Sequence, residues 1–203
     1  MKYFHLLSIL LLLGFLTACG GEEISTANLP LSEETTQTTG DTEPVPPPTP
    51  VTYGWETPFT GELLYATNVL LAYQVSVPAD MSFNAAEVIV KSVVTPASGR
   101  MALYNDAGTK PSTLISGSDL KSLAVGVNSF SFTPVDVIAG NYWIVFNFNN
   151  SSTLGVQSNT GSTTARAYRN VDPTTPWPTD ESAQTYTSGG AAEPNMVISG
   201  YLK

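Results

Sequence analysis

A short stretch near the end of the chain gathers the side chains that sugar-binding sites use. Aromatic rings stack on the C–H edges of a sugar, while guanidinium, carboxylate and amide groups hydrogen-bond its hydroxyls. Between residues 166 and 180 such groups follow one another among loop-forming residues. The sequence therefore predicts a ligand site in this stretch, with the candidate residues Arg166, Tyr168, Arg169, Asp172 and Trp177.

The same residues also have a simpler interpretation, which stays open. Trp177 stands between Pro176 and Pro178, and a large aromatic side chain in a proline-rich loop commonly packs against the core. In that case Trp177 closes one end of the fold and the two arginines of the stretch are solvated. An exposed groove that holds Trp177 would favour the sugar site.

Catalytic chemistry has few options in this chain. His5 is the sole histidine and lies in the N-terminal leader described below, so the mature chain has no Ser-His-Asp triad and no histidine-ligated zinc. Glycosidases instead use two carboxyl groups about 5–9 Å apart. Glu56, Glu62, Glu87 and Asp136 are candidates, but their spacing in the sequence singles out no pair. We therefore expect a non-catalytic protein.

One further cluster has the residue types of a metal site. Asn105 and Asp106, ahead of Gly108, have oxygen atoms that calcium accepts as ligands. The full Asp/Asn ladder of a calcium loop is missing, however, and a hairpin turn explains the same residues. The sequence thus predicts no metal and no cofactor.

The N-terminus is typical of an exported protein. Lys2 precedes an uncharged run over residues 6–16, which has the length of a signal-peptide core and is too short to span a bilayer. The run closes with Leu16-Thr17-Ala18-Cys19, which resembles the lipobox of bacterial lipoproteins. The resemblance implies that residues 1–18 are a signal peptide and that Cys19 is lipidated. Simple secretion is the alternative, but its cleavage site would want a small residue where Leu16 stands.

The residues after the cysteine bear on the destination of the protein. In Gram-negative lipoproteins an aspartate directly after the cysteine favours the inner membrane, and this chain has Gly20 there. The resemblance therefore implies a cell-envelope protein that is anchored in the outer membrane rather than the inner one. The acidic pair Glu22-Glu23 resembles a surface-export signal of some lipoproteins, and it is equally explained as part of a solvated linker.

Charge and composition predict a tether after the cysteine. Without residues 1–18 the chain keeps 7 of its 8 lysines and arginines against 17 acidic residues, a net charge of −10, which argues against nucleic acid as a partner. Residues 19–50 combine the lipidated cysteine with a segment rich in Thr, Glu and Pro. This segment has too few apolar residues to form a core, so we expect a disordered linker. Its proline-rich end should be extended.

Residues 51–203 have the size of one domain, and their apolar residues recur with period two. This alternation predicts strands over residues 69–77, 86–94, 100–105 and 142–149, and another through Phe130 and Phe132 that ends near Pro134. Weaker patterns lie at 154–158, 163–168, 184–187 and 196–202. Eight to ten short strands between Gly, Pro, Asn and Ser turns predict an all-β fold: a single antiparallel β-sandwich, jelly-roll-like.

Several pieces of this domain resemble a recurrent secreted bacterial module. They are the stretch 102–108 (ALYNDAG), the stretch 110–115 (KPSTLI), the stretch 139–144 (AGNYWI) and the pair Trp177-Pro178. The resemblance implies a jelly-roll-like sandwich that binds glycan or acts as a spacer, and it transfers no catalytic residue. We therefore expect a membrane-anchored binding module for a polysaccharide or another surface polymer. A structural or adhesive role through an envelope protein is the alternative, and a carboxylate glycosidase is a third.

Overall fold

The computed structural model describes residues 45–93, 96–149, 152–158, 166–189 and 192–203. Every regular element in these ranges is a β-strand, and none of their segments forms a helix long and apolar enough to cross a membrane. Residues Val45–Lys203 form one compact unit. The predicted signal peptide and most of the predicted linker, up to residue 44, lie outside the described residues.

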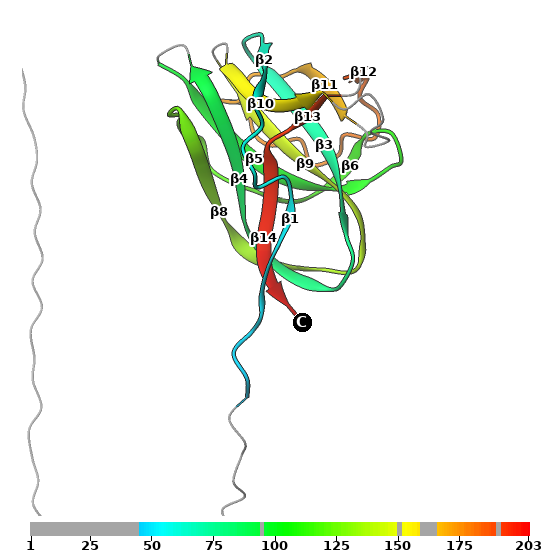
Figure 1. The fold of residues 1–203 in the computed structure, drawn as a ribbon. Helices are drawn as coiled ribbons and strands as arrows, with labels where there is room; N and C mark the ends of the chain where they lie inside the picture. The colour runs from blue at the N-terminus through cyan, green and yellow to red at the C-terminus, as the bar shows by residue number, and fades with distance from the viewer. Residues whose placement is uncertain (1–44, 94–95, 150–151, 159–165, 190–191) are drawn as a thin grey trace, which may run out of the picture. The chain divides into compact units, whose positions relative to one another are not determined.

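The strands pair into two antiparallel sheets that pack face to face, so the predicted all-β sandwich is confirmed (Figure 1). In the first sheet, sheet A, β14 and β8 flank β4, and β1 pairs with the outer side of β14. Its strands are β1 (Pro50–Gly54), β2 (Gly61–Tyr65), β4 (Met81–Val93), β8 (Gly126–Val137), β10 (Ser152–Ser158), β13 (Ala192–Pro194) and β14 (Met196–Leu202).

The second sheet, sheet B, is built around β9, which pairs with β3 on one side and β5 on the other. Its strands are β3 (Val69–Val77), β5 (Ser98–Asp106), β6 (Pro111–Gly117), β7 (Lys121–Ser122), β9 (Gly140–Phe148), β11 (Arg166–Asn170) and β12 (Thr187–Ser188). The order along the sheet is β12-β11-β3-β9-β5-β6, with β7 paired to β5. The strands predicted over 69–77 and 142–149 are thus neighbours.

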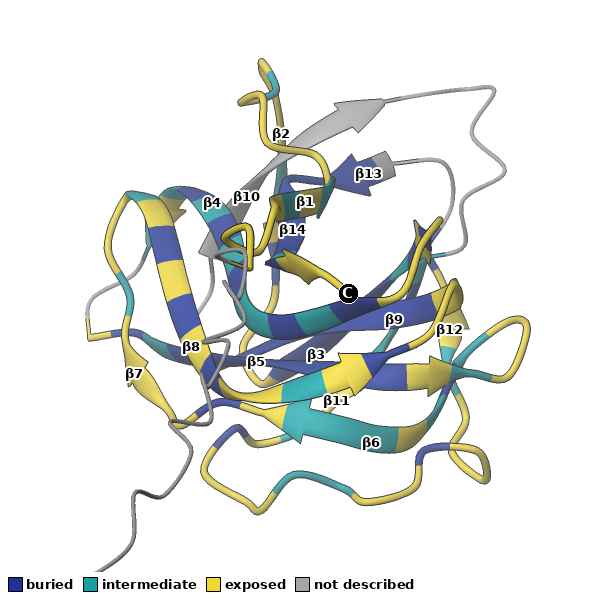
Figure 2. Cartoon of the chain, turned by 90° about the horizontal axis from the view of Figure 1, so that it is seen from below, coloured by how far each residue is buried: buried dark blue, intermediate teal, exposed yellow. Residues whose placement is uncertain are grey.

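The core lies between the two sheets and is made by alternate residues of each strand. Side chains such as Leu71, Phe83, Val88, Phe130 and Phe146 are fully or almost fully buried there. Burial of each large apolar side chain contributes about 1.5–3 kcal/mol. Figure 2 shows the alternation along β8, where buried and exposed residues take turns.

Sheet B is buried on its second face as well. Leu70, Ala72, Trp143 and Val145, which alternate with the core residues of β3 and β9, form a smaller apolar cluster. The loop over residues 171–186 covers this cluster. Two backbone hydrogen bonds join the loop to β6, from Leu114 N to Thr179 O (3.0 Å) and from Glu181 N to Ser112 O (2.9 Å). Trp143 is therefore fully buried.

β8 runs three residues past the position where the sequence predicted its end. It continues through Pro134 to Val137. The strand can contain this proline because β8 is an edge strand: among the described strands, it pairs with β4 alone. Proline lacks a backbone N–H and is tolerated on such an edge strand or at a bulge. The pairing with β4 shifts register at this point, between Phe83↔Val135 and Ala85↔Ser131.

Candidate functional site

The structure distributes the predicted ligand residues over both faces of sheet B. In β11, Tyr168 packs against the core between the sheets, while Ala167 belongs to the cluster on the outer face. Side chains alternate along a strand, so Arg166 shares the face of Tyr168, and Arg169 lies on the outer face. The five candidates therefore do not form one site.

Arg169 is held in a buried network on the outer face. Its guanidinium makes a two-pronged ion pair with the Glu181 carboxylate, which is completely buried. The Tyr186 hydroxyl donates to the same carboxylate at 2.9 Å. Burial, and then the negative charge of Glu181, raise the pKa of Tyr186. This network fixes the 171–186 loop against sheet B, which is a structural role.

Trp177 packs in the way the simpler interpretation describes. The indole N–H donates to the Ser118 carbonyl at 2.9 Å, and the Arg100 guanidinium lies 3.9 Å from the centre of the ring. Tyr104 meets the ring edge-on, and a side chain at Gly117 would collide with it. Trp177 is half-buried, and one face of its ring is already engaged by a cation.

Asp172 shapes a turn at the start of the same loop. Its carboxylate accepts hydrogen bonds from the Thr174 backbone N–H at 2.9 Å and the Thr174 hydroxyl at 2.8 Å. These bonds, led by the one from the backbone N–H, lower the pKa of Asp172. The predicted turn at Asp106 has the same character, since its carboxylate accepts the Gly108 N–H at 2.9 Å.

Arg166 and Tyr168 line a hollow of about 330 Å³ at one end of the sandwich. The Arg166 guanidinium donates to the Tyr65 hydroxyl at 2.8 Å. We call this space the Arg166 hollow; its other lining residues are Leu63, Leu64, Ala66, Val69, Asn170, Ser188 and Gly189.

The residue that sequence reasoning missed is Trp55, in the loop after β1. Its side chain is 37% exposed, yet its indole N–H donates to the Tyr73 hydroxyl at 2.6 Å, and Phe59 packs beside it at 5.5 Å between ring centres. The sequence signal was weaker than for Trp177, because Trp55 directly follows Gly54 but the next proline, Pro58, comes three residues later.

A buried amide holds this loop in place. The Asn195 side chain donates to the backbone carbonyls of Trp55 (3.1 Å) and Thr57 (2.7 Å) and accepts the N–H of Phe59 at 2.8 Å. The backbone N–H of Trp55 also donates to the Met196 carbonyl at 3.1 Å. The exposed ring is thus carried by a loop with a fixed conformation.

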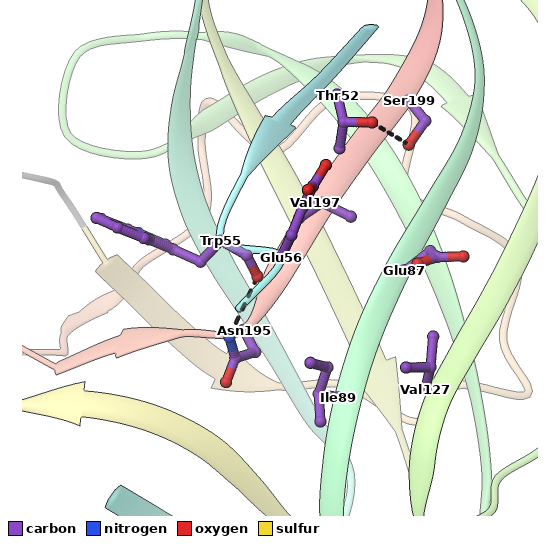
Figure 3. Close-up of a pocket in the computed structure, with 9 residues that line it drawn as sticks. All are labelled: Thr52, Trp55, Glu56, Glu87, Ile89, Val127, Asn195, Val197 and Ser199. Carbon is purple, nitrogen blue, oxygen red and sulfur yellow. Dashed lines mark hydrogen bonds between the residues drawn. The ribbon is translucent and has the colours of Figure 1, made fainter. Parts of the chain in front are cut away.

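Trp55 borders two hollows. One, the sheet A groove, has a volume of about 280 Å³ and is lined by Thr52, Trp55, Glu56, Glu87, Ile89, Val127, Asn195, Val197 and Ser199. Figure 3 shows Trp55 and Glu87 at opposite sides of it, with Val197 of β14 between them. The other, the edge hollow, has about 320 Å³ and is lined by Gly54, Trp55, Tyr73, Gln74, Val75, Ser76 and Asn141.

Two of the four candidate carboxylates line the sheet A groove. Glu56 is exposed, whereas Glu87 is half-buried and accepts a hydrogen bond from the Ser129 hydroxyl at 2.6 Å. Asp136 lies elsewhere and pairs with Lys203. Glu62 lies on β2, outside the groove. The fold therefore selects a pair that the sequence could not.

No protein-family model matches the chain, and the curated proteins give no match to it.

Proposed function

We propose that the protein is a lipid-anchored cell-envelope protein whose β-sandwich binds a polysaccharide across Trp55 without cleaving it. The observation that carries the proposal is a partly exposed indole that is fixed by hydrogen bonds and bordered by two hollows that contain polar side chains. Each of the following features supports this function.

The first feature is the stacking surface. A tryptophan ring stabilises a fold when it is buried, and an exposed ring loses part of that stabilisation. The chain nevertheless holds Trp55 at the surface, where its indole N–H donates to the Tyr73 hydroxyl. Because the Asn195 contacts fix the loop, little conformational entropy is lost when a sugar ring stacks on the indole. The site is preorganised for a flat, C–H-rich ligand.

The second feature is the supply of hydrogen-bonding groups on both sides of the ring. The edge hollow has the amide of Asn141 and the hydroxyl of Ser76, and the sheet A groove has the carboxylates of Glu56 and Glu87 and a hydroxyl from Thr52. Amides and carboxylates recognise sugar hydroxyls in a geometry-dependent way. The volume of each hollow is close to about 300 Å³, which is the lower limit for small-ligand pockets. A polymer that crosses Trp55 places successive sugars in the two hollows.

The third feature is the N-terminal motif, which supports the anchor. A lipidated Cys19 with two or more acyl chains would hold the protein stably on its membrane. The variant Cys19→Ser should then leave the membrane fraction or remain unprocessed. Retention of this variant in the detergent phase of a partition assay would contradict the anchor.

The test of binding is affinity electrophoresis of the full chain, in a non-ionic detergent, through gels that contain different polysaccharides. We expect at least one polymer to retard the protein and Trp55→Ala to weaken this binding about tenfold or more. Tyr201→Ala is the matched control, because Tyr201 is 40% exposed and lines neither hollow. Equal retardation of both variants would contradict the assignment. If no polymer retards the chain, an envelope protein becomes the better candidate partner.

A second candidate function, glycoside hydrolysis, rests on the pairing of Glu56 and Glu87 in one groove. Glu87 lies on β4 and Glu56 in the loop after β1, and these two strands lie on opposite sides of β14. Release of reducing ends that is lost in both Glu56→Gln and Glu87→Gln would establish hydrolysis.

A further inference from the structure

We propose that the Arg166 hollow is a separate binding site for a carboxylate carried on a compact body about the size of one sugar ring. The site lies apart from Trp55 and shares no lining residue with the sheet A groove or the edge hollow. It therefore stands or falls independently of the polysaccharide site.

The first argument is charge. The chain has three arginines, and among the described residues only Arg169 is paired with a carboxylate. Arg169 pairs with Glu181, and Arg100 stacks over Trp177. Arg166 donates to the neutral hydroxyl of Tyr65 and lies 6.0 Å from the centre of that ring, and neither ion pair found among the described residues involves it. A half-buried guanidinium at a hollow thus lacks an anion within the part of the chain that the structure describes.

The second argument is that the side chain is positioned rather than loose. Arg166 begins β11 opposite Tyr73, and its carbonyl accepts the Gly189 N–H at 2.8 Å. Gly189 packs so closely on the arginine stem that a Cβ there would overlap Nε, Cγ and Cδ. With one terminal nitrogen bound to Tyr65, the planar fork has a fixed direction. Such a fork suits the two oxygens of a carboxylate.

The third argument is the shape of the hollow, which specifies the rest of the ligand. Leu63 and Leu64 both line the hollow; Leu63 also packs against the core, and Leu64 is 67% exposed. Tyr168 adds an aromatic side chain, and the exposed Asn170 and Ser188 add an amide and a hydroxyl. The volume of about 330 Å³ admits a single ring with its substituents. A uronic acid combines a carboxylate, a C–H-rich ring and hydroxyls in that space.

The experiment is isothermal titration of the full chain in detergent with three probes: glucuronate, glucose and benzoate. Glucuronate should bind, and its affinity should fall as sodium chloride is added, because the contact is between opposite charges. Glucose should bind about tenfold more weakly or not at all. Benzoate tests which kind of molecule carries the carboxylate. If benzoate binds as tightly as glucuronate, the ligand is a general aromatic or aliphatic acid. If benzoate binds more weakly than glucuronate, the ligand is an acidic sugar. Both results support a carboxylate site.

Variants locate the binding. Arg166→Gln should lower glucuronate affinity about tenfold or more, and Arg166→Lys should fall between that variant and the parent because the charge stays while the fork is lost. Lys203→Gln is the control, since it removes one positive charge from the exposed C-terminus. Equal affinity for glucose and glucuronate in the parent chain would overturn the proposal even if Arg166→Gln failed to fold. Full affinity in a folded Arg166→Gln would also overturn it.

Discussion

Replacement of Asn195 by alanine should destabilise the fold and release the loop that carries Trp55. The side-chain amide makes three hydrogen bonds, two to the carbonyls of Trp55 and Thr57 and one from the N–H of Phe59, and the residue is 1% exposed. A typical hydrogen bond contributes roughly 1 kcal/mol, so Asn195→Ala should lower the free energy of unfolding by about 3 kcal/mol. For a domain of this size that corresponds to a melting temperature lower by about 6–12 °C.

The assay is thermal and urea unfolding of Asn195→Ala beside Asn141→Ala. The control deletes the same amide from an exposed residue and should change stability by less than about 0.5 kcal/mol. Tryptophan emission at low denaturant should report a more mobile Trp55 only in Asn195→Ala. If the two variants unfold together, the loop is not held by the buried amide and the preorganisation argument fails.

Three further predictions concern the outer face of sheet B. Arg169→Met leaves the buried carboxylate of Glu181 without its cation, so urea unfolding should show a loss of about 3–5 kcal/mol, and unchanged stability would contradict the ion pair. Gly117→Ala places a Cβ 2.5 Å from the Trp177 ring and should cost about 1–3 kcal/mol in the same assay, whereas a neutral result would mean that the ring is free to move. Burial and the Glu181 charge raise the pKa of Tyr186, so this tyrosine keeps its proton in the folded protein while the unfolded chain ionises near pH 10. The free energy of unfolding should therefore keep its full Tyr186 contribution below pH 10 and fall above it by about 1.4 kcal/mol per pH unit. Phenolate absorbance of Tyr186→Phe against the parent checks the assignment.

The sandwich was predictable where strands alternate strongly. The runs at 69–77 and 142–149 became β3 and β9, because alternate residues of each pack into the core. The short strands β1 and β2 were not predicted. β1 begins at the last proline of the Pro-rich segment and depends on pairing with β14, which lies nearly 150 residues away, so local sequence carries little signal for it.

The candidate site was less predictable, because its parts are brought together by pairings between distant strands. Trp177 and Trp55 are both tryptophans in loops, Trp177 between two prolines and Trp55 directly after Gly54. The Ser118 carbonyl and the Arg100 guanidinium engage Trp177, and the Asn195 amide presents Trp55. Local composition identifies aromatic loops, but only the tertiary partners decide which ring remains accessible.

The most direct test of polysaccharide binding across Trp55 is oxidation by N-bromosuccinimide followed by peptide mass spectrometry, with and without the polymer that retards the chain. Trp143 is fully buried and Trp177 is half-buried, so Trp55, at 37% exposure, should be oxidised first. The account predicts that bound polysaccharide protects Trp55 while Trp177 reacts as before. Oxidation of Trp55 at an unchanged rate in the presence of bound polymer would contradict it.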